Sequence, residues 1–594
     1  MRRAAVLSAM LVLVSGVAFA HVGAHPSVHD TVAGIVQRMQ KEIPVDQLTR
    51  ITLDEVLEFL TPEEREILGN EHLVFTVNVP VVLTVFRQAE PAEVVFWLDE
   101  RGFEKTGFTA ESGGDVYEGW QKSFDAGEIG LGVNSLTGSG DHYFVCLTPR
   151  NPADRIELSD IYPGQHTVGT FRAGERPYAG WDERVLEQVP AALDGHVLLR
   201  GDQDKRRSAM LTNIFRATDY PATVVPDQVV LTWSGDPRTT QAVQWRTTDI
   251  IEAGAVRYRA AGSGEWTVVD AETKPLVAYN TANDPVVNRH TAVLTGLAPG
   301  RVYEYAVGNG TDDTWSKTAT FKTAPAGAEP FTFVYMGDAQ NGLDTWGNLV
   351  QKAYAEEPEA AFYIMAGDLV NRGNERADWD SLFQNAAGVY DHRPVVPAIG
   401  NHECQGEQGP WMYLELFDLP ENGPAGLPPE RAYAFHYSNA LFVVLDSNLP
   451  AESQTEWLEE QLAATEATWK FVVYHHPAYS SGPRRDNADI RALWGALFDK
   501  YHVDLALQGH DHAYLRTWPM RDQKRVDSPS EGTIYIVSVS GTKFYEQGEF
   551  DYTEFGMTNV STYQVLDIQI DGNRLAYKAY DIEGSVRDEF VIEK

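Results

Sequence analysis

The sequence predicts a multidomain chain in which an N-terminal α+β region and an all-β sandwich precede a C-terminal α/β domain. The length of 594 residues exceeds what one hydrophobic core holds, and suggests about three or four folding units. Residues 226–325 contain short, β-branched strands separated by turns, as in a sandwich. Residues 330–594 alternate apolar runs with longer helical or polar segments, which is typical of an α/β domain.

Residues 1–20 have the pattern of a removable export signal. Arg2 and Arg3 precede an apolar run that closes with the small-x-small triplet Ala18-Phe19-Ala20. We expect cleavage after Ala20 and a secreted or periplasmic mature chain, by ordinary secretion, because nothing beyond the two arginines supports a twin-arginine route. A transmembrane helix needs about 20 apolar residues, and no later stretch is that long and that free of charge.

The formal charge of −37 limits the partners of the chain. It argues against nucleic acid or anionic lipid as the main partner, because the far field would repel both. A small phosphate ester stays compatible, since salt screens that field within about 10 Å at 0.1 M and bound cations dominate the potential inside a cleft. The composition leaves the oligomeric state open.

Two cysteines, Cys146 and Cys404, are present. This number excludes a disulfide-built scaffold and a thiolate zinc cluster. One disulfide between the two cysteines and two free thiols both remain open.

Residues 21–71 are predicted to be a helical segment, because apolar residues repeat there at helical spacing. Thr52 with Glu55 forms one capping box. Thr61 with Glu64 begins a second helix, which we expect to end at Gly69.

Residues 72–225 are predicted to form a β-rich domain of unknown role. Phe75 and Val77 alternate with polar residues, and Val94–Leu98 and Tyr143–Leu147 are short apolar runs typical of strands. Residues 151–225 contain turn signals and scattered aromatic residues, but no pattern that assigns them a fold.

The predicted sandwich of residues 226–325 carries two further signatures. Trp233 and Trp245 lie in strand-like stretches, as the core tryptophans of paired sheets do. The stretch from Leu294 to Tyr305 resembles the tyrosine corner of fibronectin type III domains, where a tyrosine hydroxyl ties a strand to the preceding corner. Proline and glycine in residues 323–330 indicate a linker to the next domain.

Each apolar run of residues 330–594 is followed by residue types that bind metals. The segments are Gly337-Asp338-Ala339-Gln340, Gly367-Asp368, Gly400-Asn401-His402-Glu403, His475-His476-Pro477 and Gly509-His510-Asp511-His512. In α/β sheets ligands bind beyond the carboxyl ends of strands, so we expect these segments to converge on one site. Carboxylate, amide oxygen and imidazole suit Zn, Fe or Mn, and two such ions about 3.5–4 Å apart can clamp the attacking and leaving oxygens of a displacement.

The order and spacing of these segments resemble the metallophosphoesterase superfamily, and in particular its purple acid phosphatase branch, whose members carry a fibronectin-like domain just before the catalytic one. The resemblance covers about Pro226 to Lys594 and nothing before residue 225. It implies a catalytic domain of two β-sheets flanked by helices. It also implies a metal-dependent phosphatase that hydrolyses phosphate monoesters.

The resemblance further implies roles for single residues. A first metal would be held by Asp338 and His512, and a second by Asn401, His475 and His510, with Asp368 bridging the two. A hydroxide activated by these metals would attack phosphorus.

His402 would then assist the leaving alkoxide. His402 and His476 are thus candidates for catalytic roles beside Asp368, although each is as well explained as a hydrogen-bonded core histidine.

Two positions depart from the family pattern. Purple enzymes have a tyrosine three residues after the bridging aspartate, where this chain has Asn371, and other branches have a histidine two residues after the first aspartate, where it has Gln340. The first metal is left with an amide oxygen of Gln340 or Asn371, or with water, and a hard ferric ion loses its best ligand. We therefore expect a colourless protein with two divalent ions (Fe, Zn, Mn or similar).

Two alternatives remain. A phosphodiesterase or nucleotidase would use the same metals, because substrate choice depends on loops such as 405–430 and 522–558. A non-catalytic envelope or adhesion module would explain the missing tyrosine and histidine by a degenerate site. The retained Asp368, Asn401 and last three histidine ligands argue against that module.

Overall fold

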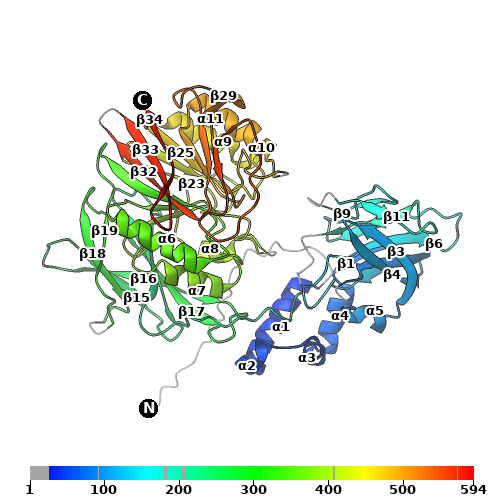
Figure 1. The fold of residues 1–594 in the computed structure, drawn as a ribbon. Helices are drawn as coiled ribbons and strands as arrows, with labels where there is room; N and C mark the ends of the chain where they lie inside the picture. Colours follow the sequence, from blue (N-terminus) through cyan, green and yellow to red (C-terminus); the bar gives the residue numbers. More distant parts are fainter. Residues whose placement is uncertain are drawn as a thin grey trace, which may run out of the picture. The chain divides into compact units, whose positions relative to one another are not determined.

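The computed structural model describes residues 26–90, 93–179, 184–202, 209–311, 314–405, 408–483, 485–570 and 573–594. The predicted export signal, residues 1–20, lies outside this part of the chain. The described residues form two compact units (Figure 1). One holds the residues up to Arg38 and Ile51–Thr212, and the other holds Met39–Arg50 and Asn213–Lys594. In the described ranges, we find no helix with the length and apolarity needed to cross a membrane.

The N-terminal region is helical, as predicted. Its helices are α1 (Val28–Glu42), α2 (Val45–Leu48), α3 (Leu53–Phe59) and α4 (Pro62–Asn70). A further helix, α5 (Phe96–Glu100), follows later in the chain. Both predicted capping boxes are present, since the hydroxyls of Thr52 and Thr61 accept hydrogen bonds from the amides three residues later and the glutamates return them. Helix α4 runs past Gly69 to Asn70 rather than ending at the glycine.

The first unit is rich in strands, including the stretch that the sequence left unassigned. A three-stranded sheet has the order β5 (Gly127–Leu131), β1 (Leu73–Val77), β7 (Leu158–Tyr162). A seven-stranded sheet has the order β10 (Leu186–Gln188), β3 (Glu104–Ser112), β4 (Asp115–Phe124), β2 (Val81–Gln88), β6 (Phe144–Pro149), β11 (His196–Leu199), β8 (Val168–Phe171), and β12 (Gly201–Asp202) pairs with β9 (Tyr178–Ala179). This unit ends at Thr212, so residues 213–225 belong to the second unit.

The strand predicted at Val94–Leu98 is wrong, because residues 96–100 form helix α5. A short apolar run fits a buried helical turn as well as a strand, and only tertiary packing decides between them. Here Trp97 and Leu98 are buried, and the Trp97 ring meets Phe103 edge to face with the centroids 5.4 Å apart.

The two cysteines are free thiols. Cys146 lies buried on β6 of the first unit, and Cys404 belongs to the second unit. Burial raises the pKa of both thiols, which makes them poor nucleophiles. The sequence left open a disulfide or two free thiols, and the structure has two free thiols.

Residues 227–322 form the predicted sandwich. The strand order is β13 (Asp227–Thr232), β14 (Gln241–Thr248), β17 (Val286–Leu294), β16 (Thr267–Val277), β15 (Gly254–Ala260), β18 (Val302–Gly308), β19 (Ala319–Lys322). Trp245 is fully buried in the core of the sandwich. The Tyr303 hydroxyl accepts a hydrogen bond of 2.8 Å from the amide of Ala298, which makes the predicted tyrosine corner.

The C-terminal domain contains two sheets. The six-stranded sheet has the order β22 (Val395–Pro397), β21 (Tyr363–Met365), β20 (Phe331–Met336), β32 (Thr562–Gln569), β33 (Arg574–Asp581), β34 (Val586–Glu593). The seven-stranded sheet has the order β23 (Tyr433–Tyr437), β24 (Ala440–Val444), β25 (Trp469–Val473), β26 (Leu505–Gln508), β30 (Ile534–Val537), β27 (Tyr514–Thr517), β31 (Thr553–Met557), and β28 (Met520–Arg521) pairs with β29 (Lys524–Arg525). Neighbouring strands run parallel from β20 through β21 to β22, and from β24 through β25 and β26 to β30.

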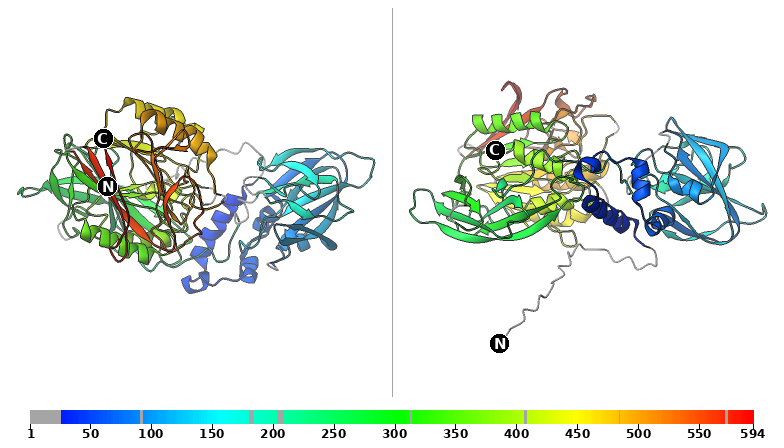
Figure 2. Two further views of the ribbon diagram at one scale, coloured as in Figure 1. Left: turned by 45° about the horizontal axis from the view of Figure 1, so that its top comes forward. Right: turned by 90° about the horizontal axis from the view of Figure 1, so that it is seen from below.

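Helices cover the outer faces of these sheets (Figure 2). The helices are α6 (Leu343–Glu356), α7 (Arg376–Asn385), α8 (Trp411–Leu416), α9 (Glu452–Ala464), α10 (Ala488–Ile490), a π-helical turn at Arg491–Gly495 and α11 (Ala496–Tyr501). Successive residues of β24 and β25 alternate between two buried clusters. Phe442 and Phe471 face the six-stranded sheet, whereas Val443 and Val472 pack with α9 and α11. The domain is therefore the predicted stack of two sheets between helices.

The sandwich and the C-terminal domain share one core within the second unit. The Trp233 ring lies 5.5 Å from Phe362 and 5.4 Å from Phe435. Beside this contact, Arg246 of β14 pairs with Asp380 of α7 at 2.7 Å, and each side chain is 1% exposed. Asp380 also accepts a hydrogen bond of 2.7 Å from the Thr218 hydroxyl. The two domains are thus joined by apolar packing and by a buried ion pair.

We predict that Asp380→Ala lowers the free energy of unfolding of the second unit by about 3 kcal/mol. The change removes the buried carboxylate that accepts from Nη1 of Arg246 and from the Thr218 hydroxyl, whereas Asp227 still pairs with the other side of the guanidinium. Urea unfolding followed by tryptophan fluorescence measures it. Glu272→Ala is the control, since its pair with Lys274 is exposed to solvent. An equal, small loss in both variants would contradict the prediction.

Candidate functional site

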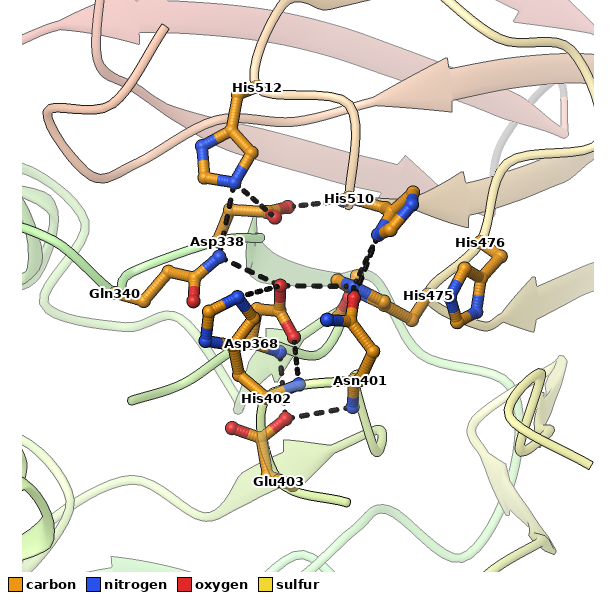
Figure 3. A network of polar contacts seen from close by, with 12 residues as sticks. Asp338, Gln340, Asp368, Asn401, His402, Glu403, His475, His476, His510 and His512 are labelled. Carbon is orange, nitrogen blue, oxygen red and sulfur yellow. Dashed lines mark hydrogen bonds and ion pairs between the residues drawn. The ribbon is translucent and has the colours of Figure 1, made fainter. Parts of the chain in front are cut away.

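The loops that follow five parallel strands bring the predicted site residues together (Figure 3). Asp338 and Gln340 follow β20, Asp368 follows β21, Asn401 and His402 follow β22, His475 and His476 follow β25, and His510 and His512 follow β26. Three strands come from one sheet and two from the other, so the site lies where the carboxyl ends of both sheets meet.

Two groups of these side chains could each hold a metal ion. Asp338, Asp368 and His512 offer ligand atoms within 4.8 Å of one another, and so do Asp368, His475 and His510. Asp368 belongs to both groups and therefore lies between the two positions. Asn401 joins the second group, because its Oδ1 is 2.9 Å from Nδ1 of His510 and 3.2 Å from Nε2 of His475.

The histidines are oriented by main-chain carbonyls. Nδ1 of His475 donates to the carbonyl of Ala366 at 2.9 Å, and Nδ1 of His512 donates to that of Lys543 at 3.0 Å. A carbonyl only accepts, so each of these two rings carries a proton on Nδ1, and its Nε2 faces the cluster. His510 turns Nδ1 inward instead. This arrangement is the one that imidazole ligands of metals adopt.

Orphaned oxygens support a cation at the first position. Oδ1 of Asp338 and Oε1 of Gln340 are buried and have no hydrogen-bond partner among the described residues. The other end of the Gln340 amide donates to Oδ2 of Asp368 at 2.8 Å. An unpaired buried oxygen costs about 1–3 kcal/mol, which a coordinated cation would offset. The donor set of carboxylate, imidazole and amide oxygens fits a divalent metal.

The charges of the site also favour a cation. Burial alone would lower the pKa of His475, but the Asp368 carboxylate raises it to about 10. In turn His475, against the effect of burial, lowers the pKa of Asp368. Burial raises the pKa of Asp338 well above its usual value. The protein compensates one buried carboxylate with a proton on His475, and a divalent cation would compensate both.

The main chain is strained at the ligands. Asp338, Asp368, His510 and His512 all adopt the left-handed conformation, with φ between 50° and 75°. Such conformations cost about 1–3 kcal/mol each and cluster at functional sites. Close approach adds a second constraint, because a Cβ at Gly400 would lie 2.2 Å from Oδ1 of Asp368.

Glu403 holds two of the ligand loops together. Its buried carboxylate accepts hydrogen bonds from the main-chain amides of Asp368 (2.9 Å), Leu369 (2.9 Å), Val370 (3.3 Å) and Gly400 (2.8 Å). Burial and the nearby Asp368 raise the pKa of Glu403 to about 7. From the sequence we expect Glu403 to orient a neighbour, and here it positions the loops of Asp368 and Asn401.

The other predicted residues lie around the two groups. Nε2 of His402 is 4.0 Å from Oδ2 of Asp368, its amide donates to Oδ1 of Asp368 at 2.9 Å, and its ring contacts the carbonyl of Asn371. The described contacts of Asn371 at the site are thus made by its main chain. His476 hydrogen-bonds the Ser447 hydroxyl at 2.9 Å, and its ring lies 4.3 Å from that of His510. Burial lowers the pKa of His476 to about 3, so it is neutral.

Sequence reasoning missed a set of residues beside His510 and His512. Arg485 donates from Nε to Asp511 at 2.7 Å and from Nη2 to the His510 carbonyl at 3.0 Å. Lys543 and Tyr545, in the loop after β30, contact His512. They lie in the predicted specificity loop 522–558, but a loop sequence does not show which side chains face a site.

Comparisons with known proteins agree with this geometry. Residues 226–323 match the model described as "Purple acid Phosphatase, N-terminal domain", and residues 331–514 match "Calcineurin-like phosphoesterase". The C-terminal domain is therefore a metallophosphoesterase domain. Together with the sandwich before it, it makes the chain a purple acid phosphatase-like protein, which confirms the predicted resemblance.

Curated relatives align with about half of the chain. An uncharacterized protein of Mycobacterium tuberculosis is 29% identical over 332 residues, 49% of this chain and 62% of that protein. The Fe(3+)-Zn(2+) purple acid phosphatase 12 of Arabidopsis thaliana is 24% identical over 315 residues, 49% of this chain and 65% of that protein. The match thus spans less than two thirds of these relatives.

A solved purple acid phosphatase from yellow lupin (Lupinus luteus) seeds has a similar fold. Its TM-score is 0.55 at 16% sequence identity, with 88% of this chain and 94% of that chain covered. At this identity the likeness shows the fold alone.

We predict that Glu403→Ala lowers metal affinity about 10- to 100-fold, because the four amides lose their common acceptor and the ligand loops separate. Metal titration monitored by calorimetry measures it. Glu456→Ala removes an exposed carboxylate of α9 and should leave the affinity unchanged. Wild-type affinity in Glu403→Ala would show that the loops do not need this clamp.

Proposed function

We propose that the protein is an exported, metal-dependent phosphatase that hydrolyses phosphate monoesters at the site shared by its two sheets. The observation that carries the proposal is the pair of ligand groups joined by Asp368. A carboxylate between two ligand groups is the arrangement of dinuclear sites, whose ions clamp both the attacking and the leaving oxygens of a displacement. The matched metallophosphoesterase domain supports the same reaction class.

Two divalent ions, when bound, would supply Lewis acidity and a nucleophile at neutral pH. The first ion would be held by Asp338, His512 and Asp368, with Gln340 as a further oxygen ligand. The second would be held by Asp368, Asn401, His475 and His510. Asn371 is the weaker of the predicted ligands, because its described contacts at the site come from its carbonyl.

His402 is the residue that we assign to the leaving group. It reaches the edge of the site with its Nε2, and its side chain is 19% exposed, so it can meet a substrate oxygen from the solvent side. The hydrogen bond between its amide and Asp368 fixes its position. A proton given to the leaving alkoxide from this place completes the hydrolysis.

The local charge of the site favours a phosphate dianion in spite of the acidic chain. Asp338 and Asp368 are the formally anionic ligands, so two divalent cations leave the site with a net positive charge. The formal charge of −37 acts at longer range and is screened by salt. Export, the remaining part of the proposal, rests on the predicted signal in residues 1–20.

We predict that Asp368→Asn abolishes the hydrolysis of phenyl phosphate, because both ligand groups lose their shared carboxylate. A chelator should abolish the activity of the wild type, and added divalent metal should restore it. Steady-state assays with phenyl phosphate and with bis(phenyl) phosphate, side by side, measure both effects and separate monoesterase from diesterase. Asp270→Asn, at an exposed carboxylate of β16, should behave as the wild type. Activity that survives chelation and the Asp368 substitution would refute a dinuclear mechanism.

We predict that the purified protein is colourless, because Asn371 stands where a phenolate would hold ferric iron. An absorption spectrum recorded with metal analysis of the same sample tests this, including after the protein has been loaded with iron. A visible tyrosinate-to-iron charge-transfer band in the iron-loaded sample would disprove it.

A further inference from the structure

The loop after β30 is fixed against His512 by main-chain hydrogen bonds. The Lys543 carbonyl accepts from Nδ1 of His512 at 3.0 Å, and the Tyr545 amide donates to the His512 carbonyl at 3.0 Å. The Tyr545 ring lies 4.9 Å from the imidazole of His512. Lys543 and Tyr545 are therefore held at the edge of the ligand cluster, with the Tyr545 ring against His512.

Arg485 approaches the same tyrosine from the loop after β25. Its guanidinium is 5.1 Å from the centre of the Tyr545 ring, and two of its nitrogens bind Asp511 and the carbonyl of His510. Asp511 is fully buried, so its ion pair fixes the position of the Arg485 guanidinium. Its third nitrogen, Nη1, has no hydrogen-bond partner in the described part of the chain, and its side chain is 28% exposed.

Lys543 supplies a second cation. Its Nζ lies 5.2 Å from the centre of the same ring, so its distance from the guanidinium cannot exceed about twice that length. Among the described residues, no carboxylate pairs with this ammonium group. The chain has 85 acidic residues against 48 basic ones, so an unpaired lysine is not explained by a shortage of carboxylates. An ammonium group that has no carboxylate partner and lies beside the proposed phosphate-binding site is consistent with a role in binding substrate.

We propose that Arg485 and Lys543 are specificity-determining residues that bind a second anionic group of the substrate, apart from the phosphoryl group that is hydrolysed. The preferred substrates are then phosphate esters that carry a further carboxylate or phosphate. Nη1 of Arg485 and Nζ of Lys543 belong to charged groups and have N–H bonds that donate to no described acceptor. Hydrogen bonds from such charged donors to carboxylate and phosphate oxygens are stronger than hydrogen bonds between neutral groups. This proposal rests on the proposed phosphatase function and extends it to the choice of substrate.

The test compares two substrates that differ in one anionic group, phenyl phosphate and 4-carboxyphenyl phosphate. In the full-length, metal-loaded protein, Lys543→Ala should lower the ratio of kcat/KM for the carboxylated ester to kcat/KM for phenyl phosphate about tenfold, with metal content measured alongside because the Lys543 carbonyl binds His512. Lys543→Arg should keep the preference. Lys524→Ala, which removes an exposed lysine of β29 and changes the net charge equally, should have no effect on either substrate.

Three further results complete the test. The preference of the wild type should fall as ionic strength rises, because the added interaction is between charges. Arg485→Ala should also reduce the preference, with metal content measured alongside because Arg485 contacts His510. An equal loss for both substrates in Lys543→Ala, or no loss for either, would overturn the specificity proposal while leaving the phosphatase intact. Failure of the wild type to hydrolyse either ester would instead refute the proposed function.

Discussion

The buried carboxylate of Glu403 is the interaction on which the candidate site depends. It gathers amides from the loop of Asp368 and from Gly400, next to Asn401, and so fixes the bridging carboxylate relative to the second group of ligands. The ligand loops need such a restraint, because several of their residues are held in left-handed conformations that an unrestrained chain would leave. Gly400 can approach Asp368 only because it has no side chain. The Glu403 hydrogen bonds and the close approach of Gly400 thus together hold the strained ligand loops in place.

Much of the catalytic half follows from its sequence. Buried parallel strands are short and apolar, so β20, β21, β24, β25 and β26 can be placed from the apolar runs. The ligand types that follow β20, β21, β25 and β26 can be read directly. Short strands without a long apolar run, such as β22 at Val395–Pro397, carry too weak a signal. In the first unit, Val94–Leu98 has the composition of a strand and the packing of a helix. Arg485 and Lys543 could not be placed at all, because loop geometry brings them together from separate parts of the chain.

The chain combines a strongly acidic composition with a site that, under the proposed function, binds an anion. These properties do not conflict, because they act over different distances. The excess of carboxylates sets the far field, which salt reduces within about 10 Å. At the site, His475 pairs with Asp368, Arg485 pairs with Asp511, and the Lys543 ammonium lies over the Tyr545 ring. These cations are closer to a bound ligand than the surface carboxylates are. A strongly acidic composition is therefore compatible with the binding of a phosphate dianion that we propose.

The contact of Trp233 of the sandwich with Phe362, next to β21, and with Phe435 of β23 has a consequence for evolution. Arg246 and Asp380 are buried in the same interface, so each domain has apolar and charged side chains there that only the other domain shields from solvent. A gene rearrangement that separated the two would expose the Trp233 ring and the aromatic residues that it covers, and it would break the buried ion pair between Arg246 and Asp380, so selection would remove it. Residues 213–594 are therefore expected to be inherited as one block.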